Sequence, residues 1–129
     1  MTKVFIKKKD NKIFEVECDG HTNYGEKGED IVCASLSSIV QTAVLGLLMV
    51  ALLEIDMKRD DEMGYLRFTL PEKMTKEQSL QASAILDTMF CGIADLNESF
   101  SDYIELEVKN LWQCLWISSY LLTTKAAVQ

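Results

Sequence analysis

Two side chains in this 129-residue chain are well suited to chemistry, a histidine and a cysteine twelve positions apart. His21 is the chain's single histidine and lies in a glycine-containing loop, while Cys33 follows near the expected start of a helix. An imidazole that takes the proton of a nearby thiol leaves a nucleophilic thiolate, as in a thiol protease. The spacing alone fits a small buried cysteine and a solvated histidine as well, and taken alone it favours that structural explanation.

Asp30 is expected to be the N-cap of the helix that carries Cys33. Cys33 would then be the third helical residue, beside unpaired N–H groups and the positive end of the helix dipole, which favour a thiolate. A carboxylate close to the thiol would oppose its ionisation, so capping is preferred to a role for Asp30 in orienting His21. Ser37, one turn further on, shares the face of Cys33; it could hydrogen-bond a substrate or the thiol, or simply permit close packing.

A metal site explains the same residues less well. Cys18, His21 and Cys33 would supply three ligands, but a fourth is missing and Cys18 alternates toward the core. The glycines at positions 20, 25 and 28 fit a loop that closes over a substrate, and their spacing is not that of a dinucleotide or phosphate-binding loop. We therefore expect no metal and no cofactor.

The elements that must position these residues follow from hydrophobic periodicity. Strands are predicted at residues 4–8, 13–18, 64–70 and 103–108, with Phe14, Val16 and Cys18 facing inward in the second. Helices are predicted from Asp30 to about Leu53 and from the capping box at residues 75–78 to about residue 98, with a charged connector at 54–63. The order β-β-α-β-α-β predicts an α+β fold, a two-layer sandwich of two helices on a four-stranded, mostly antiparallel sheet.

We expect one domain, residues 1–109, followed by a C-terminal extension of unknown role, residues 110–129. Residues 31–53 contain no charged side chain and are long enough to span a membrane. Polar interruptions and acidic flanks favour instead a core helix whose far face meets a second copy of the chain, which predicts a homodimer and no membrane partner.

Charge and cysteine content narrow the classes further. The net charge of −7 disfavours direct nucleic-acid binding and favours a cationic partner or substrate. The four cysteines lack CxxC spacing and no secretory signal precedes them, so we expect free thiols in a reducing cytoplasm.

The segment Gly20-His21-x-x-Tyr24-Gly25, followed by Gly28-x-Asp30-Ile31-Val32-Cys33-Ala34-x-x-Ser37, resembles the ribosomal-processing cysteine protease family, Prp. The resemblance covers roughly residues 2–108. It implies a bacterial cytoplasmic, homodimeric endopeptidase that removes the N-terminal extension of large-subunit ribosomal protein twenty-seven, cutting after a phenylalanine that precedes basic residues.

Carried over by position, the resemblance makes Cys33 the nucleophile and His21 the general base. Gly20, Tyr24, Asp30 and Ser37 match other motif positions and are expected to shape the substrate pocket or orient the pair. Residues 110–129 have no counterpart in the family. The alternatives are a non-catalytic module that binds a ribosomal protein, a thiol redox or metal protein, and a purely structural homodimer.

Overall fold

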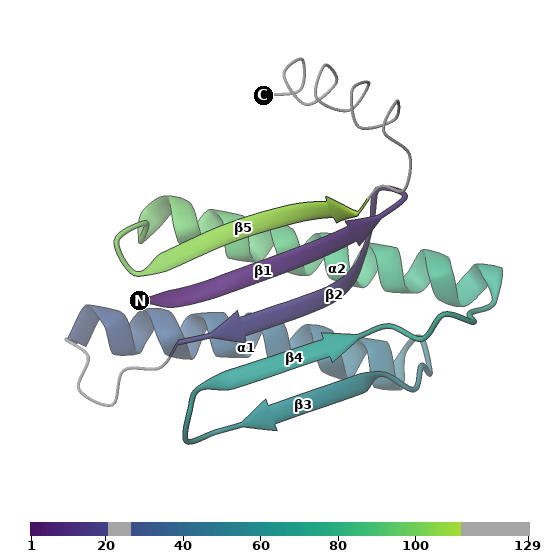
Figure 1. Cartoon of the computed structure of the whole chain (residues 1–129), viewed down its shortest axis with the longest axis horizontal. Helices are drawn as coiled ribbons and strands as arrows, with labels where there is room; N and C mark the ends of the chain where they lie inside the picture. Colours follow the sequence, from purple (N-terminus) through teal and green to yellow (C-terminus); the bar gives the residue numbers. More distant parts are fainter. Residues whose placement is uncertain (21–26, 112–129) are drawn as a thin grey trace, which may run out of the picture.

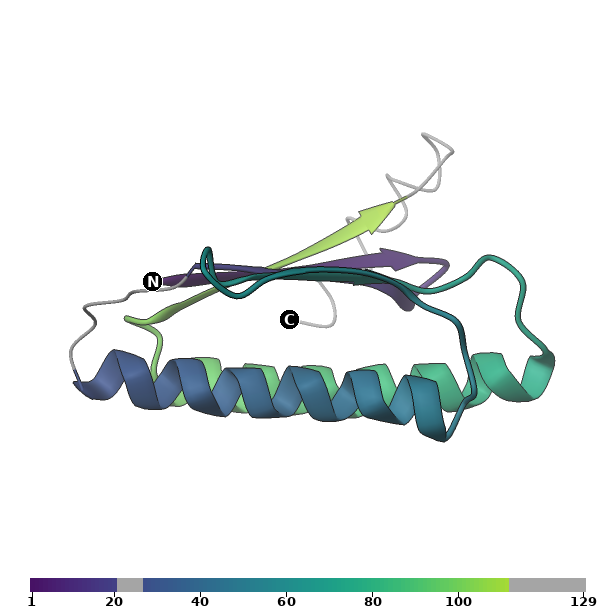
Figure 2. The ribbon, with the colours of Figure 1, turned by 90° about the horizontal axis from the view of Figure 1, so that it is seen from below.

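The structure is a computed structural model that describes residues 1–20 and 27–111, and the side chains of residues 1–20 and 31–111. A five-stranded sheet forms one layer and two long helices form the other, both on the same face of the sheet (Figures 1 and 2). The elements in chain order are β1 (Thr2–Lys9), β2 (Lys12–Asp19), α1 (Lys27–Met49), β3 (Asp56–Asp60), β4 (Tyr65–Thr69), α2 (Lys76–Ser99) and β5 (Ile104–Leu111). The α+β two-layer prediction is confirmed.

The strand order is β3-β4-β2-β1-β5. Every neighbouring pair is antiparallel except β1 and β5, which run parallel. The sheet is therefore mostly antiparallel, as predicted. It places the N-terminal strand between the second strand and the last, so that residues at the start of β1 lie beside the end of β2.

The predicted number of strands is wrong, because the charged connector contains β3. All five residues of β3 are exposed, and four of them are charged, so the sequence shows no buried face there. Its extended conformation comes from pairing with β4, from Asp56 opposite Thr69 to Asp60 opposite Tyr65. The strand therefore depends on its partner, which local sequence patterns do not report. The first helix also ends earlier than predicted, since α1 ends at Met49 and not at Leu53.

The β1–β2 hairpin turns at Asp10 and Asn11, which have φ of 53° and 64°, as expected of these turn-forming residues. The register shifts between Lys7 and Lys8, which pair with Glu15 and Ile13. This bulge puts Ile13 in the core and leaves Phe14 only partly buried, so the predicted inward position of Phe14 is wrong, whereas those of Val16 and Cys18 are confirmed.

The core lies between the sheet and the helices. From α1 it takes Val32, Leu36, Val40 and Leu47, and from α2 Ala82, Leu86, Met89 and Ile93, packed on the inward side chains of the strands. The capping box of α2 is confirmed: Gln78 N–H donates to Thr75 Oγ1, and Thr75 N–H donates to Gln78 Oε1, both at 3.0 Å.

By length and composition alone, residues Ile31–Met49 could cross a membrane, a test that the core helix of a soluble protein also passes. About a third of this stretch is buried, on the side that faces the sheet and α2. Of the expected C-terminal extension, the first two residues belong to β5, and residues 112–129 lie outside the described part of the chain.

Candidate active site

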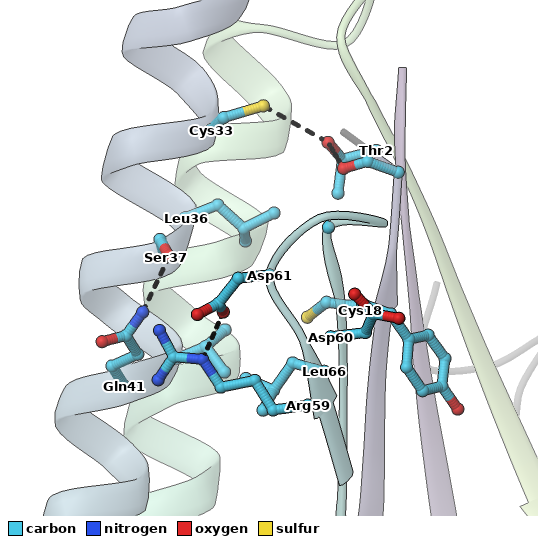
Figure 3. A pocket seen from close by; sticks show the side chains of 14 residues that line it. Thr2, Cys18, Cys33, Leu36, Ser37, Gln41, Arg59, Asp60, Asp61 and Leu66 are labelled. Atoms are coloured by element: carbon cyan, nitrogen blue, oxygen red, sulfur yellow. Dashed lines mark hydrogen bonds and ion pairs between the residues drawn. The ribbon is translucent and has the colours of Figure 1, made fainter. Parts of the chain in front are cut away.

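Cys33 lies on α1 where the helix passes the start of β1 and the β3–β4 hairpin. Its side chain is half-buried and lines a cavity of about 220 Å³. Figure 3 shows the thiol directed from the helix toward the start of β1. The cavity is lined from four parts of the chain: β1 (Thr2), the end of β2 (Cys18 and Gly20), α1 (Cys33, Leu36, Ser37, Val40 and Gln41) and the hairpin (Arg59, Asp60, Asp61, Gly64, Tyr65 and Leu66). The fold therefore builds a solvent-connected space around one of the predicted catalytic residues.

The prediction that Asp30 is the N-cap is wrong, because α1 begins at Lys27. Acidic residues are as favourable within the first turn as at the cap, so Glu29 and Asp30 can stabilise the helix from inside it. Cys33 is then the seventh helical residue and not the third, and its N–H pairs with the carbonyl of Glu29 in the regular helical pattern. The helix dipole acts mainly over the first turn, so other groups must complete the surroundings of the thiol.

Thr2 is the described side chain that meets the thiol. Its Oγ1 lies 3.5 Å from Cys33 Sγ and donates a hydrogen bond of 3.1 Å to the carbonyl of Gly20 (Figure 3). No sequence pattern points to this residue, because its role depends on β1 passing beside α1. Thr2 therefore links Cys33 to Gly20, the residue that precedes His21.

Gly20 holds a backbone conformation that only glycine adopts readily, with φ of 131°. A Cβ at this position would lie 2.5 Å from the carbonyl oxygen of Met1 and 2.8 Å from Cα of Thr2. The Gly20 N–H donates to the carbonyl of Gly64 at 3.3 Å. The chain is thus fixed between β1 and the β3–β4 hairpin immediately before His21.

Ser37 lies in the same cavity, as its spacing from Cys33 predicted. Its Oγ accepts a hydrogen bond of 3.0 Å from Gln41 Nε2, and the side chain is exposed (Figure 3). Ser37 is therefore available to a bound molecule, while Thr2 is the group that contacts the thiol. His21 and Tyr24 lie outside the described residues, as does the side chain of Asp30.

The β3–β4 hairpin brings charge to the rim of the cavity. Arg59 Nε donates to Asp61 Oδ1 at 2.6 Å, and Asp60 Oδ1 accepts from the N–H groups of Glu62 and Met63, which fixes the turn (Figure 3). The sequence predicts only a charged connector at residues 54–63, so these residues are not among the predicted site residues. The available signal was Gly64, which takes φ of 64° at the end of the turn and is typical of a tight hairpin.

The other described cysteines are less suited to nucleophilic chemistry. Burial, followed by the charge of Glu17, raises the pKa of the Cys18 thiol to about 12, so Cys18 is protonated at neutral pH. Cys91 is exposed on α2 and does not line the cavity. Within residues 1–20 and 31–111 no group of three or more His, Cys, Asp or Glu side chains is arranged to hold a metal ion.

A half-buried thiol on the wall of an open cavity, carried by an α+β sandwich, defines the class as a candidate cysteine hydrolase. Comparison with known proteins agrees. Residues 1–105 match the family described as cysteine protease Prp. The chain therefore belongs to the cysteine protease Prp family.

The individual relatives compared are each less than 30% identical to this chain. The chain is 27% identical over 97 residues to the ribosomal processing cysteine protease Prp of Bacillus subtilis, covering 75% of this chain and 87% of the relative. It is 29% identical over 100 residues to the Staphylococcus aureus protein of the same name, covering 78% and 91%. The crystal structure of an essential ribosomal processing protease Prp from S. aureus, in complex with a substrate peptide, superposes with a TM-score of 0.74 at 28% identity, covering 84% of this chain and all of that one.

Proposed function

We propose that this chain is a ribosomal-processing endopeptidase in which Cys33 is the nucleophile and His21 the general base. The observation that carries the proposal is the position of Cys33. Its half-buried thiol lines an open cavity and is joined through Thr2 to Gly20, the residue before the chain's single histidine. The family assignment supports peptide-bond hydrolysis.

In this mechanism the Cys33 thiolate attacks the scissile carbonyl carbon and forms an acyl-enzyme through a tetrahedral intermediate. His21, which has taken the thiol proton, delivers it to the leaving amine as the C–N bond breaks. Water then hydrolyses the thioester, releases the acid product and restores the thiol. Because the Cys33 N–H is paired within α1, the N–H groups of residues 27–30, the first turn of the helix, are better candidates for stabilising the oxyanion.

The proposed substrate is a ribosomal protein precursor, which is a basic protein and matches the net charge of −7. The relatives in B. subtilis and S. aureus are named ribosomal processing proteases, and the S. aureus enzyme has been crystallised with a substrate peptide. The described cysteines are free thiols, in keeping with the bacterial cytoplasm as the proposed location.

The test is cleavage of a peptide that spans the extension of ribosomal protein twenty-seven, followed by mass spectrometry. Cys33→Ala should lower kcat/KM by a factor of about 10³ or more, since removal of a nucleophile leaves only binding and electrostatic effects. Cys91→Ala, which changes an exposed cysteine on α2, should cleave like the wild type. Undiminished cleavage by Cys33→Ala would remove Cys33 from the mechanism.

We also propose a homodimer formed through the helical layer. An apolar groove of about 620 Å³ runs between α1 and α2 on the outer face, and its lining is rich in small residues: Ser38, Ile39, Thr42, Ala43, Gly46, Ala84, Ile85, Thr88, Met89 and Gly92. Leu45, Leu48 and Met49 on α1 are exposed as well. Small residues let helices approach closely, and exposed apolar area of this kind favours association with a second copy.

Light scattering after size-exclusion chromatography tests the dimer. Thr42→Glu with Leu45→Glu would place two buried, unpaired charges in the interface and should convert a dimer to a monomer. Met63→Glu, which changes an apolar side chain in the β3–β4 turn that is more exposed than Leu45, should leave the mass unchanged. A wild-type protein that is monomeric at micromolar concentration would refute the proposal.

A further inference from the structure

Thr2 is the one buried polar side chain among the described residues, with 5% of its surface exposed. Its backbone is held from the β5 side: it pairs with Ile104 in the parallel β1–β5 register, and its N–H donates to the carbonyl of Tyr103 at 2.9 Å. The hydroxyl is therefore delivered to a fixed point between α1 and the end of β2. A buried hydroxyl needs its hydrogen-bond partners, and the two within reach are the Gly20 carbonyl and Cys33 Sγ.

These two partners make different demands on a single hydroxyl hydrogen. With a neutral thiol, Thr2 donates to the Gly20 carbonyl and can accept the S–H of Cys33. A thiolate has no hydrogen to donate and only accepts. The Thr2 hydroxyl can then satisfy the sulfur only by rotating its hydrogen from Gly20 to Cys33, a change that needs no movement of heavy atoms.

We propose that Thr2 is a positioning residue for the cleavage reaction, which holds the Cys33 thiol toward the cavity and then donates to the thiolate in exchange for its bond to Gly20. The proposal rests on Cys33 being the nucleophile. Within residues 1–20 and 31–111, Thr2 is the side chain that lies within hydrogen-bonding distance of Cys33 Sγ. Because one hydroxyl hydrogen serves both partners, loss of the Thr2–Gly20 bond would coincide with loss of the thiol proton, which the proposed function assigns to His21.

The other titratable or charged side chains on the cavity wall are Cys18, Arg59, Asp60, Asp61 and Tyr65. Cys18 is protonated at neutral pH, and Arg59 is paired with Asp61. The carboxylate of Asp60 is engaged by backbone N–H groups of its own turn, and the Tyr65 hydroxyl donates to Glu17 at 2.8 Å. Arg59, Asp60, Asp61 and Tyr65 thus have partners of their own, whereas the Thr2 hydroxyl lies within hydrogen-bonding distance of Cys33 Sγ and can donate to a thiolate there.

The experiment compares Thr2→Val, which keeps the shape and removes the hydroxyl, with Thr2→Ser, which keeps the hydroxyl. The first readout is the rate at which iodoacetamide modifies Cys33, followed by mass spectrometry of the peptide that contains it, at pH 7 and at pH 10. The second is kcat and KM for the precursor peptide. Intact-mass measurement confirms that all the proteins compared have the same N-terminal residue, Met1. Circular dichroism confirms that they are folded.

Thr2→Val should lower both the alkylation rate at pH 7 and kcat by about tenfold, the size expected for one hydrogen bond to a charged group, with KM little changed. The difference in alkylation should narrow at pH 10, where thiols ionise without assistance. Thr2→Ser should recover most of both rates. Thr2→Ala, a second variant without the hydroxyl, is read in the same way if Thr2→Val unfolds.

Three results would overturn the proposal: a folded variant lacking the hydroxyl with wild-type alkylation and kcat, a Ser variant no better than Val, or an equal loss at pH 7 and pH 10. The last two would show that Thr2 acts through packing alone. Failure of the proposed function is a separate outcome, recognised by cleavage that survives Cys33→Ala. The alkylation readout needs no substrate and so tests the role of Thr2 in either case.

Discussion

Replacing Gly20 with alanine should disrupt both stability and catalysis, because this residue joins three parts of the site. The substitution adds a single methyl group. At φ of 131° that methyl group would lie 2.5 Å from the Met1 carbonyl oxygen and 2.8 Å from Thr2 Cα. Both atoms belong to the backbone of the N-terminal segment, so the overlap cannot be relieved by turning a flexible side chain.

The expected cost can be assembled from its parts. Holding a residue other than glycine in this region of φ costs about 1–3 kcal/mol. If Gly20 moves away from Thr2 instead, its bonds to Thr2 Oγ1 and to the Gly64 carbonyl are lost, at about 1 kcal/mol each. The alanine variant recovers about 0.4–1 kcal/mol by restricting the unfolded chain. By either route the net loss in unfolding free energy is about 1–2 kcal/mol, which corresponds to a fall in Tm of about 5 °C for a chain of this length.

Urea denaturation followed by circular dichroism measures this loss, with peptide cleavage measured below the transition. Gly92→Ala on α2 is the matched control: there a Cβ would meet the Ile39 side chain at an ordinary 3.4 Å. Gly92 also lines the groove proposed as the dimer interface, so the proteins are compared at equal mass in light scattering; that variant should then be unchanged or more stable by up to about 1 kcal/mol, because alanine favours helix over glycine. A Gly20→Ala protein with the wild-type urea midpoint and full activity would refute the account of Gly20 as a fixed point of the site.

Three further predictions concern the scaffold. Glu15 is paired with Lys7 at 2.7 Å; although burial is the largest single influence and opposes ionisation, the hydrogen bonds from Lys7 and Thr69 and the nearby positive charges together lower its pKa from 4.5. The ionised Glu15 side chain therefore stabilises the protein fully above pH 4.5, and this stabilisation is lost as the pH falls through the lower pKa of the folded state. In urea titrations, Glu15→Gln should lose about 1 kcal/mol of unfolding free energy at pH 7 and progressively less at acidic pH. An equal loss at neutral and acidic pH would contradict this. Cys18, with its pKa raised to about 12, should resist iodoacetamide at pH 8 in the native protein and react in urea, as peptide mass spectrometry would report. Thr75→Ala should cost about 1 kcal/mol in the same titrations, because it removes the capping box of α2; no change would mean that the cap contributes nothing.

Periodic patterns predicted those helices and strands in which the spacing of apolar residues shows directly which side chains are buried. The alternation of Val16 with charged neighbours and the capping box at Thr75 are signals carried within one element, and the structure confirms both. β3 carries no such signal, because its residues are exposed and its conformation is imposed by β4. The helix start was misplaced for a related reason: Asp30 suits an N-cap and a first turn equally well, and local sequence does not choose between them.

Only those residues of the candidate site that lie close together along the chain could be predicted from the sequence. Cys33 and Ser37 share one helix face, so their spacing was enough to place both in one cavity. Thr2 and the hairpin residues Arg59 to Asp61 reach the same cavity through strand pairing across the sheet. No spacing rule relates residue 2 to residue 33, which is why Thr2 could be found only from the fold.

The candidate site also depends on β5, although no residue of that strand lines the cavity. Thr2 owes its position to β5, since the last strand pairs with β1 along its length and Tyr103 accepts the Thr2 N–H. The contact beside Cys33 therefore depends on pairing between the first and last strands of the sheet. A destabilised β5 would release Thr2 before it exposed the core side chains of β2 and β4, which do not pair with β5. Weakening that edge should consequently reduce cleavage under conditions in which the protein remains folded, because Thr2, which contacts the thiol, is held by β5 at the edge of the sheet.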